Sequence, residues 1–532
     1  MPPQLPASSA DLDFRKAASL QQSGRLAEAA ALYGRLLAAF PDNPKVLNNL
    51  GAVQLQLGNV AESIALLERT LKVSPDQPLA LLNLGIGLHR LKRPDDALAS
   101  LDRALALQPD LAAAHYRRAC VLQELGLHAL ALAAADAALA LKPGHVDALL
   151  TRGGTLMSLN RFDEALASFE RAIALRPGCV NAHIFRGEML KDLKRFDEAL
   201  ASYDRAIALQ PDNADAHWSK SNLLLLMGDY AQGWLLHEWR WKSPYFSKHR
   251  REFKQPPWLG ESSPAGKTLL IHAEGGFGDV IQKCRYIPAA LALGADVILE
   301  MPPTLVRLMS SLKGNFRVVA KGDPLPAFDL HCPTMSLPLA FRTTPDSIPA
   351  DLPYLHADAD RVDSWRRRLG EKTRPRVGLA WSGTVRKEID SSPARKRGIP
   401  LQVLAPLLAL PVEFHSLQKQ LQPDELAALA GFPQIHLHHE ALEDFSDTAA
   451  LVAAMDLVIS IDTSVAHLAG ALGKATWILL PFAPDYRWTV EGAGTPWYPG
   501  ARLFRQTVSG DWSCVIREVA AGLQSAPLPD DR

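Results

Sequence analysis

The chain has 532 residues, of which 48% are hydrophobic, and its 57 Lys and Arg balance its 57 Asp and Glu. A formal net charge of zero gives no general attraction to nucleic acid, so we expect no nucleic-acid partner. The five cysteines form neither a CxxC pair nor an even framework, which favours a reducing compartment and argues against a structural zinc site. No apolar run reaches 18 residues, so we expect a cytoplasmic protein without a transmembrane segment.

Residues 10–240 carry a 34-residue period, which is the length of a tetratricopeptide repeat. Helices pack closely where side chains are small, and a proline ends one helix before the next begins. The prolines recur at Pro41, Pro75, Pro109, Pro143, Pro177 and Pro211, and ten residues later come Gly51, Gly85, Ala119, Gly153, Gly187 and Ser221. The period predicts an α-solenoid of helix pairs over residues 10–240.

A solenoid of this kind usually presents a concave face to an extended peptide or a partner protein. On the first helix of successive repeats, one position holds Asn49, Asn83 and Arg117 before the row breaks. Asparagine amides can bind the backbone of an extended chain, so we predict that these three residues line an acceptor groove. A rigid spacer remains the alternative interpretation.

Residues 241–266 are predicted to link the solenoid to the rest of the chain. Three tryptophans near its start, Trp234, Trp239 and Trp241, suit a hydrophobic cap on the last repeat. The basic run 248–251 fits either a solvated linker or an anion site.

From residue 267 onward, short apolar runs alternate with helical patterns, which predicts parallel sheets. We expect two doubly wound lobes, residues 267–345 and 375–510, separated by an interlobe segment 346–374 and followed by an amphipathic helix in residues 511–532. The expected strands are residues 268–273, 297–300, 317–320, 329–332, 376–381, 412–417, 457–461 and 476–480. Ligands in such folds bind beyond the carboxyl ends of the strands, which here is the cleft between the lobes.

A glycine turn, residues 275–278, follows the first strand and leads to Asp279. Its spacing does not match GxGxxG, so a dinucleotide site is not indicated. An aspartate at the start of a helix is either a cap that the helix dipole favours or a base that faces the cleft. Composition alone leaves both roles open for Asp279.

Residues 459–473 (ISIDTSVAHLAGALG) read as a strand that ends at Asp462, followed by a helix. The first turn of that helix has hydroxyls and backbone amides, which bind the oxygens of a phosphate or pyrophosphate. His467 lies one turn into the helix, on the side of Thr463. The alternative is that Asp462 or Thr463 caps the helix and that His467 packs in the core.

Gly278-Asp279 and the run 462–473 (DTSVAHLAGALG) together resemble the heptosyltransferase family of glycosyltransferases. That family has the GT-B fold, with two facing Rossmann-like lobes, a nucleotide-sugar donor in the C-terminal lobe and no metal requirement. The resemblance covers residues 267–524. The combination with N-terminal repeats is similar to bacterial repeat-bearing glycosyltransferases, including flagellin-modifying ones, and as architecture it resembles the protein O-GlcNAc transferases.

The resemblance implies that Asp279 is the general base that takes the proton of an acceptor hydroxyl. It also implies that Arg397, with Arg395 as its neighbouring candidate, neutralises the leaving diphosphate in place of a metal ion. The alternative for both arginines is a solvated basic loop. The other residues that it places at the nucleotide-sugar are Ser382, Gly383, Gln418, Lys419, Asp462, Thr463, Ser464 and His467.

The chain departs from typical heptosyltransferases at Ser464, where that family has glycine, and in its solenoid. An Asp358-Ala359-Asp360 string resembles a metal-binding DxD, but its place before a helix favours capping. We therefore predict a glycosyltransferase that uses a nucleotide-sugar and no further cofactor and acts on a protein, such as a flagellin-like protein, held by the repeats. The alternatives are a lipopolysaccharide-type sugar transferase and a catalytically inactive scaffold.

Overall fold

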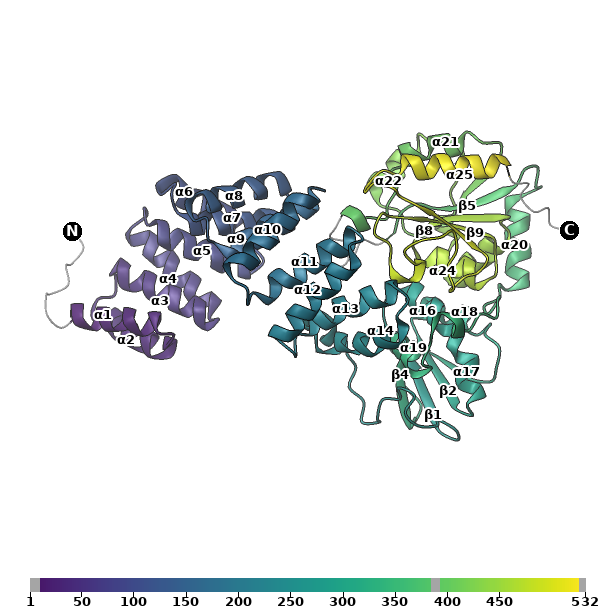
Figure 1. The fold of residues 1–532 in the computed structure, drawn as a ribbon, viewed down its shortest axis with the longest axis horizontal. Helices are drawn as coiled ribbons and strands as arrows, with labels where there is room; N and C mark the ends of the chain where they lie inside the picture. The colour runs from purple at the N-terminus through teal and green to yellow at the C-terminus, as the bar shows by residue number, and fades with distance from the viewer. Residues whose placement is uncertain (1–9, 384–392, 526–532) are drawn as a thin grey trace. The chain divides into compact units, whose positions relative to one another are not determined.

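The computed structural model describes residues 10–383 and 393–525. The chain divides into two compact units, Met1–Met189 and Leu190–Arg532. Fourteen consecutive helices confirm the predicted α-solenoid (Figure 1). They are α1 (Ala10–Gln22), α2 (Leu26–Ala39), α3 (Pro44–Leu57), α4 (Val60–Val73), α5 (Pro78–Arg90), α6 (Pro94–Leu107), α7 (Ala112–Glu124), α8 (His128–Leu141), α9 (Val146–Ser158), α10 (Phe162–Leu175), α11 (Val180–Asp192), α12 (Phe196–Leu209), α13 (Ala214–Leu226) and α14 (Tyr230–His237).

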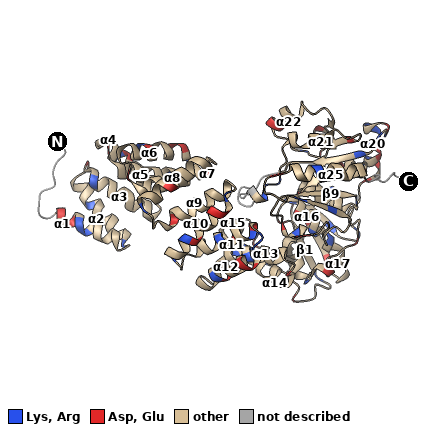
Figure 2. Ribbon diagram, turned by 45° about the horizontal axis from the view of Figure 1, so that its top comes forward, with Lys and Arg blue, Asp and Glu red and all other residues tan. Residues whose placement is uncertain are grey.

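Within the first unit, the two helices of each repeat pack tightly at the small residues of the period. A Cβ atom at Gly85 in α5 would lie 2.8 Å from Leu101 of α6. In the preceding repeat, the Ser63 hydroxyl donates a 2.7 Å hydrogen bond to the carbonyl of Gly51. Figure 2 shows basic and acidic residues interspersed along these helices, in keeping with the balanced composition.

The second unit begins with the last repeats, whose helix α14 shares a hydrophobic core with both lobes of the α/β region. Trp234 is only 2% exposed and packs edge to face on Tyr486, with ring centroids 5.5 Å apart. The indole of Trp497 donates a 3.0 Å hydrogen bond to the Tyr230 hydroxyl. The compact unit therefore starts at Leu190, whereas the sequence places the joint near residue 240.

Residues 241–266, which the sequence predicts to be a linker, hold a short helix, α15 (Pro244–Ser247). Trp258 in this stretch is 2% exposed and belongs to the core of the α/β region. Part of the predicted linker thus packs on the α/β region.

The N-terminal lobe has a four-stranded parallel sheet in the order β3-β2-β1-β4. Two helices follow β1, and a 3-10 turn separates them, because Pro288 lacks an amide hydrogen and lies at the start of the second helix. The elements are β1 (Thr268–His272), α16 (Phe277–Lys283), α17 (Ile287–Ala292), β2 (Asp296–Met301), α18 (Pro303–Met309), β3 (Arg317–Ala320), β4 (Leu330–Pro333) and α19 (Leu337–Ala340).

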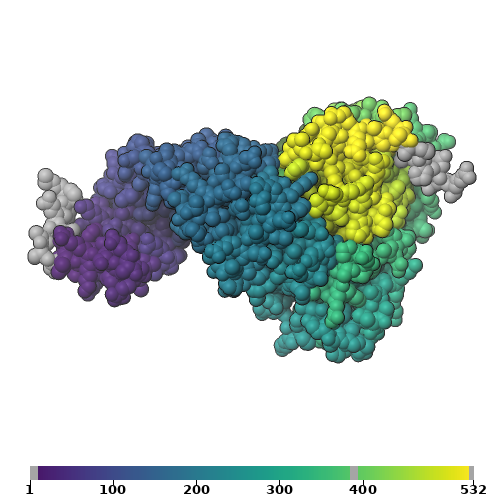
Figure 3. All heavy atoms as spheres, in the orientation of Figure 1, coloured from purple at the N-terminus to yellow at the C-terminus, as the bar shows by residue number. Residues whose placement is uncertain are grey.

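The C-terminal lobe has a six-stranded parallel sheet in the order β10-β9-β8-β5-β6-β7. Its strand order reverses beside its first strand, as in doubly wound nucleotide-binding folds. Its elements are α20 (Ala359–Leu369), β5 (Arg376–Ala380), α21 (Ala405–Leu408), β6 (Glu413–Ser416), α22 (Pro423–Leu429), β7 (Ile435–His436), α23 (Phe445–Ala453), β8 (Leu457–Ile461), α24 (Ser464–Ala471), β9 (Thr476–Leu480), β10 (Ala501–Arg505) and α25 (Ser513–Ser525). Figure 3 shows the C-terminal residues of this lobe, in yellow, as one broad patch of its surface.

Both sheets reverse their strand order beside their first strand, at β1 and β4 in one lobe and at β5 and β8 in the other. Such reversal points open a crevice at the carboxyl ends of the strands, where ligands bind. Among residues 10–383 and 393–525, no helix combines the length and apolar content needed to cross a bilayer. The same residues contain no group of three His, Cys, Asp or Glu side chains placed to hold a metal ion.

Candidate functional site

The strand-order reversal of the C-terminal lobe brings two predicted site segments together. Ser382 and Gly383 follow β5, and Asp462 and Thr463 follow its neighbour β8. A Cβ atom at Gly383 would lie 2.9 Å from Cγ2 of Thr463, so the two loops touch. Glycine at residue 383 allows this approach.

Gln418 anchors the loop after β5 from the end of β6. Its Oε1 accepts hydrogen bonds from the amides of Trp381, at 2.7 Å, and Ser382, at 2.9 Å. Its Nε2 donates to the Ser382 hydroxyl at 2.8 Å, and that hydroxyl donates to Glu425 at 2.7 Å. The carboxamide of Gln418 thus shapes the loop from a buried position, while the exposed neighbour Lys419 donates to the carbonyl of Leu442.

Helix α24 begins at the reversal point with Thr463 at its N-cap and Ser464 as its first residue. The Thr463 side chain lies 3.1 Å from the Ser460 hydroxyl and, among the residues described, makes no capping hydrogen bond. Thr463 thus occupies the N-cap position, as one of the two interpretations predicts, but caps the helix without a side-chain hydrogen bond. The positive end of the α24 dipole lies at this crevice.

Asp462 links Arg397 and His467 behind that helix terminus. Arg397 Nη1 donates to the Asp462 carbonyl at 2.9 Å and lies 3.5 Å from Oδ2, while His467 Nε2 is 3.6 Å from Oδ1. Burial opposes ionisation of Asp462, but contact with His467 and the charges of Arg397 and Arg487 outweigh it and lower the pKa of Asp462. Asp462 is thus an anion that fixes both partners.

His467 is 3% exposed, so it is packed in the core, which is one of its two predicted environments. Its Nδ1 lies 3.0 Å from the Tyr498 hydroxyl, and its ring stacks on Trp488 with centroids 5.2 Å apart. Burial lowers the pKa of His467, although Asp462 opposes the shift. A neutral imidazole therefore lies between Asp462 and Tyr498.

The glycine turn of the N-terminal lobe meets this cluster. Gly275 has φ +86°, a conformation that favours glycine, and the Asp279 carboxylate accepts a 2.7 Å hydrogen bond from the Gly276 amide. Asp279 therefore caps α16, which is one of its two predicted roles. A Cβ atom at Gly278 would lie 2.6 Å from His467 Cδ2, so α16 packs directly on α24.

Arg487 is a candidate site residue to which the sequence assigned no role. Its guanidinium pairs with Asp279 from the N-terminal lobe and with Asp485 at 2.7 Å, and its Nε donates to Gln282 at 3.1 Å. Burial acts against its charge, yet Asp485 and Asp279 raise the pKa of Arg487 well above the ordinary value. The sequence signal is modest: an arginine between two aromatic residues, 486–488, in a loop.

The predicted acceptor-groove residues lie in the first unit. Asn83 Nδ2 donates to Asn48 Oδ1 at 3.3 Å, and Asn49 Nδ2 donates to the Tyr33 hydroxyl at 3.1 Å. These contacts are partly buried. The guanidinium of Arg117 lies 4.9 Å from the ring of Tyr116. The asparagines thus form a network that crosses from one repeat to the next.

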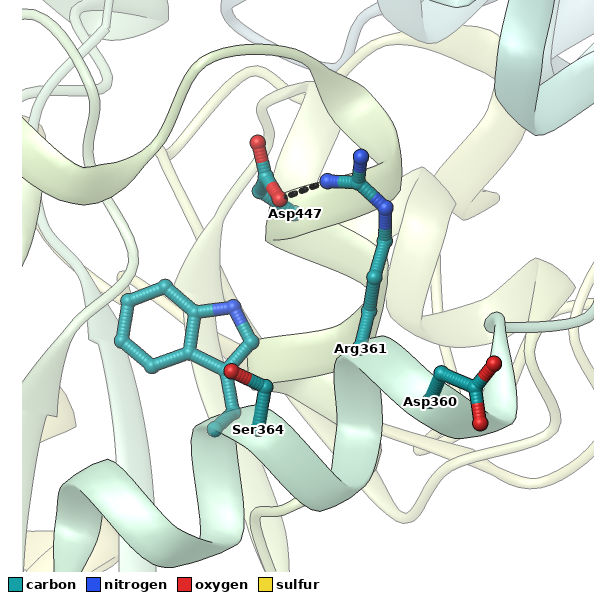
Figure 4. A pocket seen from close by; sticks show the side chains of 5 residues that line it. Asp360, Arg361, Ser364 and Asp447 are labelled. Atoms are coloured by element: carbon teal, nitrogen blue, oxygen red, sulfur yellow. Dashed lines mark hydrogen bonds and ion pairs between the residues drawn. The ribbon is translucent and has the colours of Figure 1, made fainter.

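A cavity of about 300 Å³ lies between α20 and α23 (Figure 4). Figure 4 shows Arg361 turned toward Asp447, with which it pairs, while Asp360 points away from both. Asp358 accepts a 3.0 Å hydrogen bond from the Arg361 amide, so it caps α20 as predicted for the DxD-like string. The lining residues are Asp360, Arg361, Ser364, Trp365 and Asp447.

Tetratricopeptide repeat models match residues 20–85, 82–146, 116–178, 150–214 and 190–232. The N-terminal helices therefore form a tetratricopeptide solenoid, and such arrays serve protein–protein interaction. Among solved structures, MamA is 25% identical, with a TM-score of 0.29 over 31% of this chain and 96% of MamA. A thermophilic TPR protein of Thermus thermophilus is 25% identical, with a TM-score of 0.31 over 34% of this chain and 99% of that protein.

Protein FlbA of Caulobacter vibrioides is 27% identical over 332 residues, which cover 58% of this chain and 54% of FlbA. The chain thus spans about half the length of this curated relative. The matched share exceeds the share that residues 1–240 make up, so the similarity includes part of the α/β region.

Proposed function

We propose that this chain is a glycosyltransferase that moves a sugar from a nucleotide-sugar to a hydroxyl of a protein held by the repeats. The observation that carries the proposal is the meeting of two strand-end loops from different lobes. The loop with Asp279 packs, through Gly278, on the helix that carries His467 and follows Asp462. Asp279 and Arg487, which are 208 positions apart, form an ion pair there.

The geometry supports a division of labour during transfer. The acceptor oxygen attacks the anomeric carbon while its proton passes to the Asp279 carboxylate, which Arg487 keeps oriented. The bond from the anomeric carbon to the donor phosphate breaks, and its electron pair leaves with the nucleoside diphosphate. Arg397 and the first-turn amides of α24 stabilise that charge.

The proposal that the acceptor is a protein rests on the repeats and not on the cleft. A solenoid that binds a protein raises the local concentration of its hydroxyls at the cleft. A flagellin-like protein is the acceptor class that the family resemblance suggests. The pairing of Asp279 with Arg487 also suits the second candidate, a scaffold that binds a nucleotide without turnover, because a base must be released from such a partner to accept a proton.

Donor binding provides the test, by thermal shift with UDP-, GDP-, ADP- and CMP-sugars. We expect one donor to stabilise the wild type and to lose about tenfold in affinity in Arg397→Ala. The Gly383→Ala variant should lose donor affinity by a similar factor, because its methyl group would meet Thr463. In Gly398→Ala the added methyl group meets no atom within 4 Å among the described residues, so this variant should bind the donor normally.

The Asp279→Asn variant should keep donor binding and lose transfer. Donor binding without any transfer by the wild type would favour the scaffold, and no binding in the whole panel would refute the proposal.

A further inference from the structure

Two ion pairs, each with one fully buried member, join the end of the solenoid to the two loops of the candidate site. Both lie inside the second compact unit, Leu190–Arg532. The first joins Arg240, directly after α14, to Glu274 of the N-terminal lobe. The second joins Asp192, the last residue of α11, to Arg395 of the C-terminal lobe.

The Arg240 pair holds the glycine turn that leads to Asp279. The guanidinium is 1% exposed and bonds both carboxylate oxygens of Glu274, at 2.7 and 2.8 Å. Glu274 immediately precedes Gly275, and its backbone amide donates a 3.0 Å hydrogen bond to Thr334 Oγ1, so its main chain is held as well. Arg240 also donates to Ser336 at 2.8 Å, so its contacts span the ends of β1 and β4.

The Asp192 pair holds the loop that carries Arg397. Arg395 Nη2 lies 2.7 Å from Asp192 Oδ1, and the Asp192 side chain is fully buried. Its Oδ2 has no hydrogen-bond partner among the described residues, which makes the contact with Arg395 the more necessary. Arg397 lies two residues after Arg395 and donates a hydrogen bond to the carbonyl of Asp462 at the strand-order reversal.

Holding the last repeats on the two lobes does not by itself explain these ion pairs. A buried ion pair recovers little more than the cost of removing its charges from water, and apolar side chains of similar size often stabilise a fold better. The two-point contact of Arg240 with both carboxylate oxygens of Glu274 does fix orientation, because its two hydrogen bonds allow one geometry. In the other pair, two nitrogens of Arg395 converge on one oxygen of Asp192. The apolar contacts of Tyr230 and Trp234 already attach the last repeat to the lobes.

We propose that the last repeats position the transferase cleft: Arg240 through Glu274 sets the turn that carries Asp279, and Asp192 sets the loop that carries Arg397. The members of the two pairs, Arg240, Glu274, Asp192 and Arg395, are positioning residues that need not touch a substrate. The solenoid then both recruits an acceptor and keeps the two loops in their working geometry. The catalytic meaning of the inference rests on the proposed function, whereas the positioning itself is a property of the free protein.

Hydrogen–deuterium exchange on the full chain tests the positioning without any ligand. The isosteric variants Glu274→Gln and Asp192→Asn each remove one charge. We expect Glu274→Gln to speed exchange about tenfold in peptides covering 274–280, and Asp192→Asn to do so in peptides covering 394–399, each leaving the other segment unchanged. Asp204→Asn, which removes an exposed repeat ion pair with Lys220, should change neither. No local change, or equal acceleration throughout residues 190–532, would overturn the inference.

Kinetics with a donor adds a readout that loss of stability would not produce. Asp192→Asn should weaken donor affinity about tenfold, whereas Glu274→Gln should lower the turnover number and leave donor affinity intact. The reverse assignment, or parallel losses in both variants, contradicts the proposed roles. If the wild type neither binds a donor nor transfers sugar, the proposed function fails, and the exchange pattern still decides whether the repeats position these loops.

Discussion

At the scale of single residues, Arg487 is the counter-ion of two carboxylates in the candidate site. It pairs with carboxylates from both lobes, Asp279 and Asp485, and it is 8% exposed. A guanidinium cannot lose its proton in such surroundings, so both carboxylates depend on it for a counter-charge. The ion pair of Arg487 with Asp279 orients the Asp279 carboxylate, and it also opposes the protonation of that carboxylate.

Replacing Arg487 by Gln should therefore affect folding and transfer together. We expect a loss of about 3 kcal/mol in the free energy of unfolding, because two partly buried carboxylates lose their partner. Transfer should fall by roughly a hundredfold, since Asp279 is no longer held in one orientation. Urea unfolding and a transfer assay measure the two effects. Arg502→Gln, on an exposed position of β10, is the control and should cost less than about 1 kcal/mol.

The residues of the site differ in how far the sequence could predict them. Asp462, Thr463 and His467 follow a regular strand and open a helix, so local pattern places them at one crevice. The contact of Arg487 with Asp279 spans 208 residues and depends on the path of the loop before β10. No periodicity encodes that path. The roles of the donor-site residues stay predictions.

At the scale of elements, strands with mainly apolar runs are predictable even at a sheet edge, as β3 is, whereas very short or polar strands are not. Residues 317–320, 457–461 and 476–480 form β3, β8 and β9 with the expected bounds. The edge strands β7 and β10 escaped prediction, since β7 has two residues and β10 includes the polar positions Arg502 and Arg505. Edge strands have one partner, so burial constrains their composition less.

The β6–β7 edge carries a histidine cluster whose protonation should destabilise the C-terminal lobe. His415 Nδ1 lies 3.1 Å from His438 Nε2, and the His436 ring stacks on His415 with centroids 5.0 Å apart. Burial, followed by the neighbouring His438 and His436, lowers the pKa of His415 to about 4, while Glu413 opposes the shift. Burial and Arg368 lower the pKa of His438 to about 4 as well.

Because the unfolded chain protonates these histidines near pH 6.5, it binds more protons than the folded chain between about pH 6.5 and 4. Stability should therefore fall as the pH is lowered through that window, by roughly 2 kcal/mol for His415 alone. Urea unfolding at about pH 7.5, 6 and 5 measures the slope. His415→Phe should flatten it, and an unchanged slope in that variant would show that other groups cause the acid sensitivity.

At the scale of the whole molecule, the 34-residue period and the compact units do not end at the same residue. The period continues to about residue 240, because α11 to α14 have the same small residues as the earlier repeats. The compact unit nevertheless starts at Leu190, since the later helices bury aromatic and charged side chains against the lobes. A repeat pattern reports the packing between neighbouring repeats and carries no information about what else a repeat contacts.

Two truncations should separate these boundaries. A chain of residues 180–532 keeps all of α11, Arg240 and the aromatic contacts of α14, so we expect it to fold and to bind a donor as the full chain does. A chain of residues 241–532 loses Trp234 and Tyr230 from its core, which costs about 3–5 kcal/mol for each large aromatic side chain.

The shorter chain also leaves Glu274 buried without Arg240, which adds a cost of about 3–5 kcal/mol. Together these losses match or exceed the stability of an ordinary domain, so residues 241–532 should aggregate or unfold. Thermal unfolding and donor binding of the two chains provide the comparison. Equal stability of both would place the boundary at residue 240, where the repeat period alone puts it. Transfer to a protein acceptor should be lost in residues 180–532 even where donor binding is kept, because the earlier repeats that hold the acceptor are missing.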